Sequence, residues 1–319
     1  MRLLIWHVHG SWTTAFVQGR HTCLLPLSAG RGPYGRGRAR TWDWPGSAVE
    51  VPLARLRDEQ IDAVILQRPA EEGLTTKLTG RAPGADLPAV YVEHNAPDGN
   101  VPLTRHPLAD RPDLHLVHVT HFNDLFWDCG RTPTTVIEHG IVDPGPMWTG
   151  EWARAVVVVN EPLRRGRHAG TDLLPFFAQT MPLDVFGMGV SDLPSRLGIP
   201  NVRPFEDLPQ AQMHAALARR RAYLHPFRWT SLGLSLIEAM QIGMPVVALA
   251  TTEAVEAVPP GAGVLSTSKE HLRSRLRELL ADPAGAAEMG KRAREAALAR
   301  YGLPRFLADW DRLLARVVR

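Results

Sequence analysis

A loop in the second half of the chain has the residue types of an anion-binding site. The apolar run 222–224 is followed by the polar segment 225–233 and then by a helical pattern over 232–242. The free N–H groups at a helix start attract a diphosphate, and Gly233 lets a ligand approach the backbone closely. Glu238 interrupts the apolar face of this helix. Its carboxylate could bind a ribose diol, pair with an arginine or face solvent.

A basic segment forms a second candidate. Residues 160–172 follow the apolar run 155–159 and contain three arginines and His168. Arginine makes bidentate contacts to phosphate. We therefore expect Arg164 or Arg167 to clamp a phosphate near the reacting centre. The alternative is a solvated basic loop.

The first half offers weaker candidates, each placed after an apolar run. Gly10 and Ser11 follow the run 3–8, and His94 follows the run 89–92. A single histidine is more often a packed or capping residue than a functional one, although its pKa suits proton transfer. Its position directly after an expected strand favours a functional role.

The elements that carry these residues read as short buried strands separated by helix-length segments, which is typical of parallel sheets. The segment 30–45 is rich in Gly, Arg and Pro and is expected to be irregular, and 143–146 reads as a linker. The expected strands are 3–8, 63–66, 89–92, 114–119 and 135–137, then 155–159, 183–186, 222–224 and 245–249. The remaining expected helices are 270–281, 284–300 and 303–318.

This pattern predicts an α/β protein with two Rossmann-like domains facing each other across a cleft. The domains are an acceptor-side domain over 1–146 and a nucleotide-sugar-binding domain over 147–302, and a C-terminal helix over 303–319 is expected to cross back to the first domain. Ligands of open parallel sheets bind outside the carboxyl ends of the strands, so the cleft is the expected site.

The stretch from His225 to Met240, followed by Gly-Met-Pro-Val-Val at 243–247, resembles the donor-binding region of family-4-type retaining glycosyltransferases (glycosyl transferases group 1) with the GT-B fold. The resemblance implies that Glu238 binds the donor ribose. Thr230 stands where the family has another glutamate, which touches the donor sugar, and this departure leaves the donor sugar open. The same region supplies the other expected donor contacts, which are Ser231, Leu232, Gly233 and Leu234.

Other positions resemble the family more loosely. Gly187 belongs to a Gly-x-Gly after an expected strand, and Glu256 aligns with a glutamate that precedes a valine. Ala169 stands where a phosphate-binding lysine is expected. The resemblance places His94 near the reaction centre, and it places the glycine-rich loop containing Gly10 and Ser11 near acceptor and phosphate.

The resemblance implies transfer of a hexosyl group from a UDP- or GDP-sugar to a small acceptor with retention of anomeric configuration. The leaving diphosphate would take the acceptor proton, and the protein would supply position and charge stabilisation. No Asp-x-Asp metal motif is evident, so no metal or other cofactor is expected. The alternatives are a sugar-nucleotide epimerase on the same fold and a non-catalytic nucleotide-sugar-binding protein.

Composition excludes several other classes. The 319 residues are 45% hydrophobic and 22% charged, with a net charge of +3, and no nucleic-acid motif is present. No run approaches the ~18 apolar residues of a membrane span, and the N-terminal apolar run is too short for a signal peptide. Cys23 and Cys129 form neither a disulfide framework nor a metal motif. We expect a cytoplasmic protein without integral membrane association, whose acceptor and oligomeric state stay open.

Overall fold

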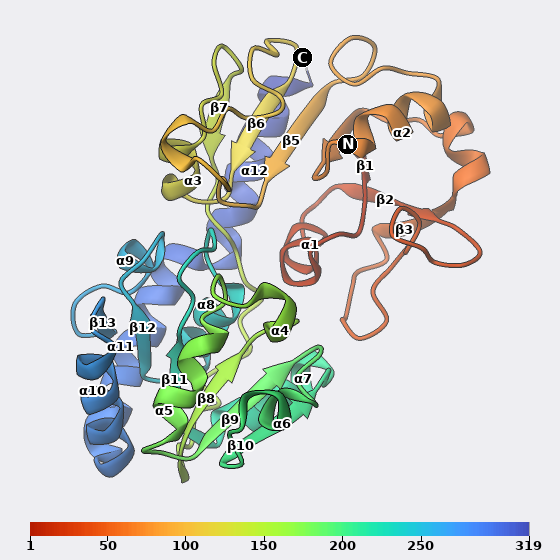
Figure 1. The fold of residues 1–319 in the computed structure, drawn as a ribbon. Helices are drawn as coiled ribbons and strands as arrows, with labels where there is room; N and C mark the ends of the chain where they lie inside the picture. Colours follow the sequence, from red (N-terminus) through yellow and green to blue (C-terminus); the bar gives the residue numbers. More distant parts are fainter. Residues whose placement is uncertain (319) are drawn as a thin grey trace. The chain divides into compact units, whose positions relative to one another are not determined.

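The computed structural model describes residues 1–318, which divide into two compact units (Figure 1). Unit 1 contains Met1–Val142 together with the C-terminal segment from Leu303, and unit 2 contains Asp143–Gly302. Each unit builds one parallel sheet with helices packed around it. The division therefore follows two separate hydrophobic cores.

Unit 1 is built on a seven-stranded sheet in the order β3-β2-β1-β4-β5-β6-β7, and every pairing is parallel. Except for β7, this is the Rossmann order, in which the connections reverse direction between the first and fourth strands. In open parallel sheets, ligands bind outside the strands at such a switch point, which here lies between β1 and β4. The strands are β1 (Arg2–Ile5), β2 (Thr22–Leu27), β3 (Ala48–Pro52), β4 (Ala63–Leu66), β5 (Ala89–Glu93), β6 (His115–His118) and β7 (Thr134–Val136).

The C-terminal helix belongs to unit 1 because its apolar side packs on the first helix. Phe306 and Trp310 are buried, and the Trp310 ring contacts the rings of Trp12 and Phe16 at 5.7 and 5.0 Å between centroids. Each buried side chain of this size contributes about 1.5–3 kcal/mol. The helices are α1 (Gly10–Phe16), η1 (Leu53–Asp58), α2 (Ala70–Thr79), η2 (Val101–Leu103), α3 (His121–Phe126) and α12 (Leu303–Val317).

Unit 2 repeats the Rossmann order with six parallel strands, β10-β9-β8-β11-β12-β13. Its switch point lies between β8 and β11, so the loops after these two strands frame the natural ligand position. The apolar strands are buried on both faces, as in other parallel sheets. The strands are β8 (Trp152–Val158), β9 (Leu183–Gly187), β10 (Val202–Glu206), β11 (Arg220–His225), β12 (Val246–Leu249) and β13 (Gly263–Ser266).

The helices of unit 2 cover this sheet. Helix α10 packs on β8, β11, β12 and β13, whereas α8 contacts β11 and β12 and is itself packed by α7 and α11. Their bounds are α4 (Pro162–Arg165), η3 (Thr171–Leu173), α5 (Leu174–Ala178), α6 (Leu193–Leu197), α7 (Gln210–Ala218), α8 (Leu234–Ile242), α9 (Ala254–Ala257), α10 (Lys269–Ala281) and α11 (Pro283–Tyr301).

The predicted fold class of two Rossmann-like domains is confirmed, although strands β2, β3, β10 and β13 were not predicted. The segment 30–45 has little regular structure, as expected. Helix α8 begins at Leu234, two residues later than its apolar pattern. Among residues 1–318, no helix combines the length and the apolar character needed to cross a bilayer.

Candidate functional site

The two loops at the switch point of unit 2 are tied together by Asp172. Its carboxylate accepts hydrogen bonds from Nη1 and Nη2 of Arg228 and from Nη1 of Arg167, which lies 2.9 Å away. The backbone N–H groups of Arg228 and Trp229 also donate to the His168 carbonyl oxygen, at 2.9 and 3.1 Å. Burial raises the pKa of Asp172, but the two arginines outweigh burial and hold that pKa below its ordinary value. The loop after β8 is therefore fixed against the loop after β11.

Arg165 is the arginine of this loop whose guanidinium group forms no ion pair or hydrogen bond with the described residues, although its backbone is bonded to Glu161 and His168. Its guanidinium lies over the Phe227 ring, 5.2 Å from the ring centre. Burial lowers the pKa of Arg165 and the neighbouring Arg164 lowers it further, against the effect of Glu161. Arginine nonetheless keeps its charge in proteins. A partly buried cation that forms no ion pair with the described residues thus sits at the switch point.

The two arginines expected as the phosphate clamp are engaged elsewhere in this structure. Arg164 pairs with Glu161 one turn before it, and Arg167 pairs with Asp172. Both guanidinium groups are largely exposed, and Arg167 serves to hold the loop. The sequence pointed to this segment, but it did not distinguish Arg165, because the distinction depends on which carboxylates lie within reach.

The expected donor contacts after β11 form the start of helix α8. Thr230 and Gly233 are partly buried, whereas Ser231 and Leu232 are buried. The Gly233 backbone lies against the His225 ring, since a Cβ at Gly233 would approach the His225 Cε1 to 2.4 Å. Burial lowers the pKa of His225 to about 3, with a smaller effect from Arg165, so the ring is neutral. At the start of α8, the Leu236 N–H donates to the Gly233 carbonyl oxygen at 2.9 Å, whereas the N–H groups of Leu234 and Ser235 precede the first acceptor that the helix offers.

Glu238 is buried on α8 and holds contacts with α7. Gln210 Nε2 donates to one carboxylate oxygen at 3.0 Å, and His214 Nε2 lies 3.3 Å from the other. A carboxylate offers about four lone-pair positions. These contacts from α7 fix the orientation of the buried Glu238 carboxylate.

The two remaining candidates of unit 2 have clear local surroundings. Gly187 has φ +139°, and a Cβ there would lie 2.1 Å from the Val159 carbonyl oxygen, so the close approach of β9 to the end of β8 requires glycine. Glu256 on α9 is exposed, with its carboxylate 3.9 Å from Arg300. The neighbouring Glu253 is buried and lies 3.1 Å from Arg300. These contacts give both Gly187 and Glu256 a structural explanation and do not test a donor role.

In unit 1, His94 lies at the switch point of the sheet. Gln67, directly after β4, donates its Nε2–H to the Trp6 carbonyl oxygen at 2.8 Å, which turns its Oε1 toward His94 Nε2 at 3.1 Å. The His94 Nε2 must then carry a hydrogen, and Nδ1 is left as an acceptor. Burial lowers the pKa of His94 well below its ordinary value, and His9 and His139 add to this, so the ring is neutral.

Gly10 and Ser11 belong to the same part of unit 1. They begin α1, and a Cβ at Gly10 would lie 3.3 Å from the Trp42 ring. The His9 ring just before them lies 4.0 Å from the His94 ring between centroids. The structure thus groups Gly10, Ser11 and His94 on unit 1 and the other candidates on unit 2. Among residues 1–318, no group of three or more His, Cys, Asp or Glu side chains could hold a metal ion.

Comparison with known families decides the enzyme class. Residues 194–296 match the family model described as glycosyl transferases group 1. The chain is a glycosyltransferase. The matched segment begins within α6 and includes β11, α8 and α9, so it contains the expected donor contacts from Thr230 to Glu256. No curated protein sequence matches the chain.

Solved structures show that the glycosyltransferase has the GT-B fold. Sucrose-phosphate synthase from Thermosynechococcus elongatus superposes with a TM-score of 0.74 at 13% identity, over 99% of each chain. HepE from Anabaena, solved with UDP-glucose, superposes with a TM-score of 0.69 at 15% identity, over 99% of this chain and 100% of that one. A glycosyltransferase from Rickettsia africae superposes with a TM-score of 0.71 at 11% identity, over 100% and 98%.

Proposed function

We propose that this glycosyltransferase takes a hexosyl group from a UDP- or GDP-sugar held by unit 2 and transfers it to a small acceptor with retention of configuration. The observation that carries the proposal is Arg165, a partly buried cation that forms no ion pair with the described residues, at the switch point of a Rossmann sheet. A diphosphate is the ligand that such a position suits, since it would complete the charge of Arg165 and accept from the N–H groups at the start of α8.

The nucleoside would extend from this diphosphate toward Glu238. Gln210 and His214 hold the carboxylate in position, and the hydroxyl groups of a ribose diol would donate to it. Thr230, Ser231, Leu232, Gly233 and Leu234 would line the diphosphate and sugar. Support for a UDP-sugar comes from the HepE complex with UDP-glucose on the same fold.

The neutral His94 would orient the donor sugar. With Nε2–H committed to Gln67, its Nδ1 can accept a hydrogen bond from a sugar hydroxyl. The leaving diphosphate would take the acceptor proton, while Arg165 stabilises the charge that develops on it. The reaction needs no cofactor in this proposal. The group 1 domain favours a transferase over both the sugar-nucleotide epimerase and the non-catalytic binding protein.

The test is a thermal-shift scan of the wild type with UDP, GDP, ADP and CDP and with their common sugar conjugates. A ligand at 100 times its Kd stabilises by about 2.7 kcal/mol, which raises the Tm by several degrees. We expect UDP or GDP to give this shift and Glu238→Ala to reduce it. If no nucleotide raises the Tm, the donor assignment of unit 2 is wrong.

A further inference from the structure

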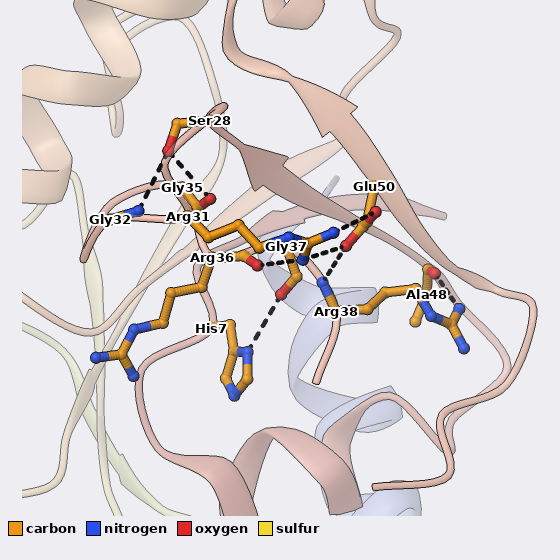
Figure 2. Close-up of polar contacts among 10 residues, drawn as sticks. All are labelled: His7, Ser28, Arg31, Gly32, Gly35, Arg36, Gly37, Arg38, Ala48 and Glu50. Atoms are coloured by element: carbon orange, nitrogen blue, oxygen red, sulfur yellow. Dashed lines mark hydrogen bonds and ion pairs between the residues drawn. The ribbon is translucent and has the colours of Figure 1, made fainter. Parts of the chain in front are cut away.

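The loop after β2 is folded back on itself by Ser28 (Figure 2). The Ser28 N–H donates to the Gly35 carbonyl oxygen at 2.9 Å, and its hydroxyl accepts from the Gly32 N–H at 3.3 Å. Beyond this turn, Arg36 pairs with Leu27 in an antiparallel bridge. The backbone of Arg36 is therefore held against the end of a core strand rather than in a loose loop.

Glu50 on β3 fixes the two arginines that flank Arg36. Its carboxylate accepts from Arg31 Nη1 at 2.9 Å and from the Arg38 backbone N–H at 2.8 Å (Figure 2). Burial raises the pKa of Glu50, but the bonds from Arg38 and Arg31 outweigh burial and hold it below its ordinary value. Gly37 has φ +66°, and a Cβ there would displace the Glu50 carboxylate, so another residue would be strained at this position.

The guanidinium groups of Arg31 and Arg38 are both engaged in hydrogen bonds with neighbouring residues. Arg31 also donates to the Arg36 carbonyl oxygen at 2.8 Å, and Arg38 donates to the carbonyl oxygens of Trp44, Pro45 and Ala48. The acceptors of both guanidinium groups are thus supplied by the loop and by strand β3. They also hold the segment that carries Trp44 in place.

The Arg36 guanidinium, by contrast, is exposed and has no hydrogen bond or ion pair with the described residues. In Figure 2 it extends away from Glu50, on the side of the loop where His7 lies. Burial is the main cause that lowers the pKa of His7; the hydrogen bond with Gly37 raises it, and the nearby charge of Arg36 lowers it.

His7 offers a second recognition group beside Arg36. Its Nδ1 lies 3.2 Å from the Gly37 carbonyl oxygen, which can only accept, so Nδ1 carries the hydrogen. The Nε2 is thereby left as an acceptor for a hydroxyl group. The ring packs on Trp44 at 4.8 Å between centroids, which fixes its orientation.

Arg68 joins this loop to the site around His94. Its Nη2 donates to the Pro33 carbonyl oxygen at 3.0 Å, and its guanidinium carbon lies 4.1 Å from the centre of the Tyr34 ring. Arg68 directly follows Gln67, which binds His94. The loop with Arg36 and the loop with His94 therefore lie at the same edge of the unit 1 sheet.

We propose that unit 1 selects an acceptor that carries an anionic group, a phosphate or a carboxylate, beside its hydroxyl groups. Arg36 binds the anion and His7 Nε2 accepts from a hydroxyl of the same molecule. The role as acceptor rests on the proposed transferase function, whereas the binding of the anion does not.

The binding test uses the line width of glycerol 3-phosphate in phosphorus NMR, without any donor. The variants are Arg36→Ala, Arg165→Ala and the control Arg57→Ala, which removes an exposed arginine from η1 on the same unit. We expect Arg36→Ala to lose most of the broadening that the wild type gives. Arg57→Ala and Arg165→Ala should both retain the broadening that Arg36→Ala removes. Equal broadening by wild type and Arg36→Ala would overturn the proposal.

The acceptor test measures nucleotide release above donor hydrolysis with matched pairs: glycerol and glycerol 3-phosphate, glucose and glucose 6-phosphate, glucose and glucuronate. The sugar nucleotide is the one that raises the Tm. We expect kcat/KM to be higher for the charged member of at least one pair, by about tenfold or more. This is the order of magnitude that a charge-assisted hydrogen bond contributes. Arg36→Ala should remove that advantage through KM, and Arg36→Lys should restore part of it. The two phosphate pairs and the glucuronate pair separate the two anion types.

Outcomes separate the two proposals. Nucleotide binding without any preference for charged acceptors overturns the acceptor inference and leaves the transferase standing. If no nucleotide binds but the broadening of glycerol 3-phosphate still depends on Arg36, the proposed transferase function is wrong and the anion site remains.

Discussion

The guanidinium of Arg165 lies over the ring of Phe227, 5.2 Å from its centre, and so joins the loop after β8 to the loop after β11. The contact fixes a cation at the point where the strand order of unit 2 reverses. An arginine stacked on an aromatic face keeps its N–H groups available at the edge of its plane. Arg165 can therefore bind a ligand without first breaking an ion pair.

Arg165→Ala is expected to weaken binding of the nucleoside diphosphate about 10- to 100-fold, since a hydrogen bond to a charged group contributes about 1.5–3 kcal/mol. Calorimetric titration with UDP or GDP measures the change. The matched control is Arg164→Ala, because Arg164 already pairs with Glu161 and is exposed. Equal losses in both variants would refute the distinction between the two arginines.

The sequence predicted the fold class because most central strands are continuous apolar runs. The strands it missed have weaker signals. Pro26 and Pro204 interrupt β2 and β10, and proline in a strand argues against pairing. Strand β3 has an alternating pattern and lies at the edge of its sheet. Strand β13 is short and also lies at an edge. Edge strands bury less apolar surface, so their sequences carry less of the pattern.

The candidate site was predicted as segments rather than as individual groups. The glycine-bearing loop and helix after β11 lie where the pattern placed them, since strand, loop and helix follow one another along the chain. Which arginine lacks a partner could not be predicted, because Asp172 reaches Arg228 from a distant loop. Gln67 was missed for a similar reason, since only the sheet order brings it to His94.

His94→Gln is expected to lower kcat about 100-fold while the affinity for the nucleoside diphosphate stays unchanged, because loss of orientation acts on the reacting sugar. Turnover of the sugar nucleotide and titration with the nucleoside diphosphate give the two quantities. His271→Asn, at an exposed histidine on α10, is the control and should alter neither. A loss of nucleotide affinity that matches the loss of kcat would show that His94 supports the fold and not the reaction.

Gly233→Ala is expected to destabilise the start of α8 by about 1–3 kcal/mol, as overpacking does, because its Cβ would meet the buried His225 ring at 2.4 Å. Nucleotide affinity should fall with it. The control is Gly73→Ala in α2, where a Cβ would meet nothing within 4 Å, and alanine should stabilise by roughly 0.5–1 kcal/mol. Urea unfolding measures both changes. A Gly233→Ala variant as stable as the wild type would show that the His225 ring moves aside.

His139 is expected to make unit 1 less stable in mild acid. Burial lowers the pKa of its imidazole to about 3, with smaller effects from His9 and Arg305, whereas an unfolded histidine titrates near 6.5. At a pH between these two pKa values, His139 is protonated in the unfolded chain and neutral in the folded chain. The contribution of His139 to the free energy of unfolding is thus fully present above pH ~6.5 and falls by up to about 1.4 kcal/mol per pH unit below it.

His139→Asn should reduce the slope of the free energy of unfolding against pH by up to about 1.4 kcal/mol per pH unit. Urea unfolding between about pH 7.5 and about pH 5 measures the slope. His271→Asn in unit 2 should leave the slope of unit 1 unchanged, and an unaltered slope in His139→Asn would mean that this histidine is protonated in the folded protein.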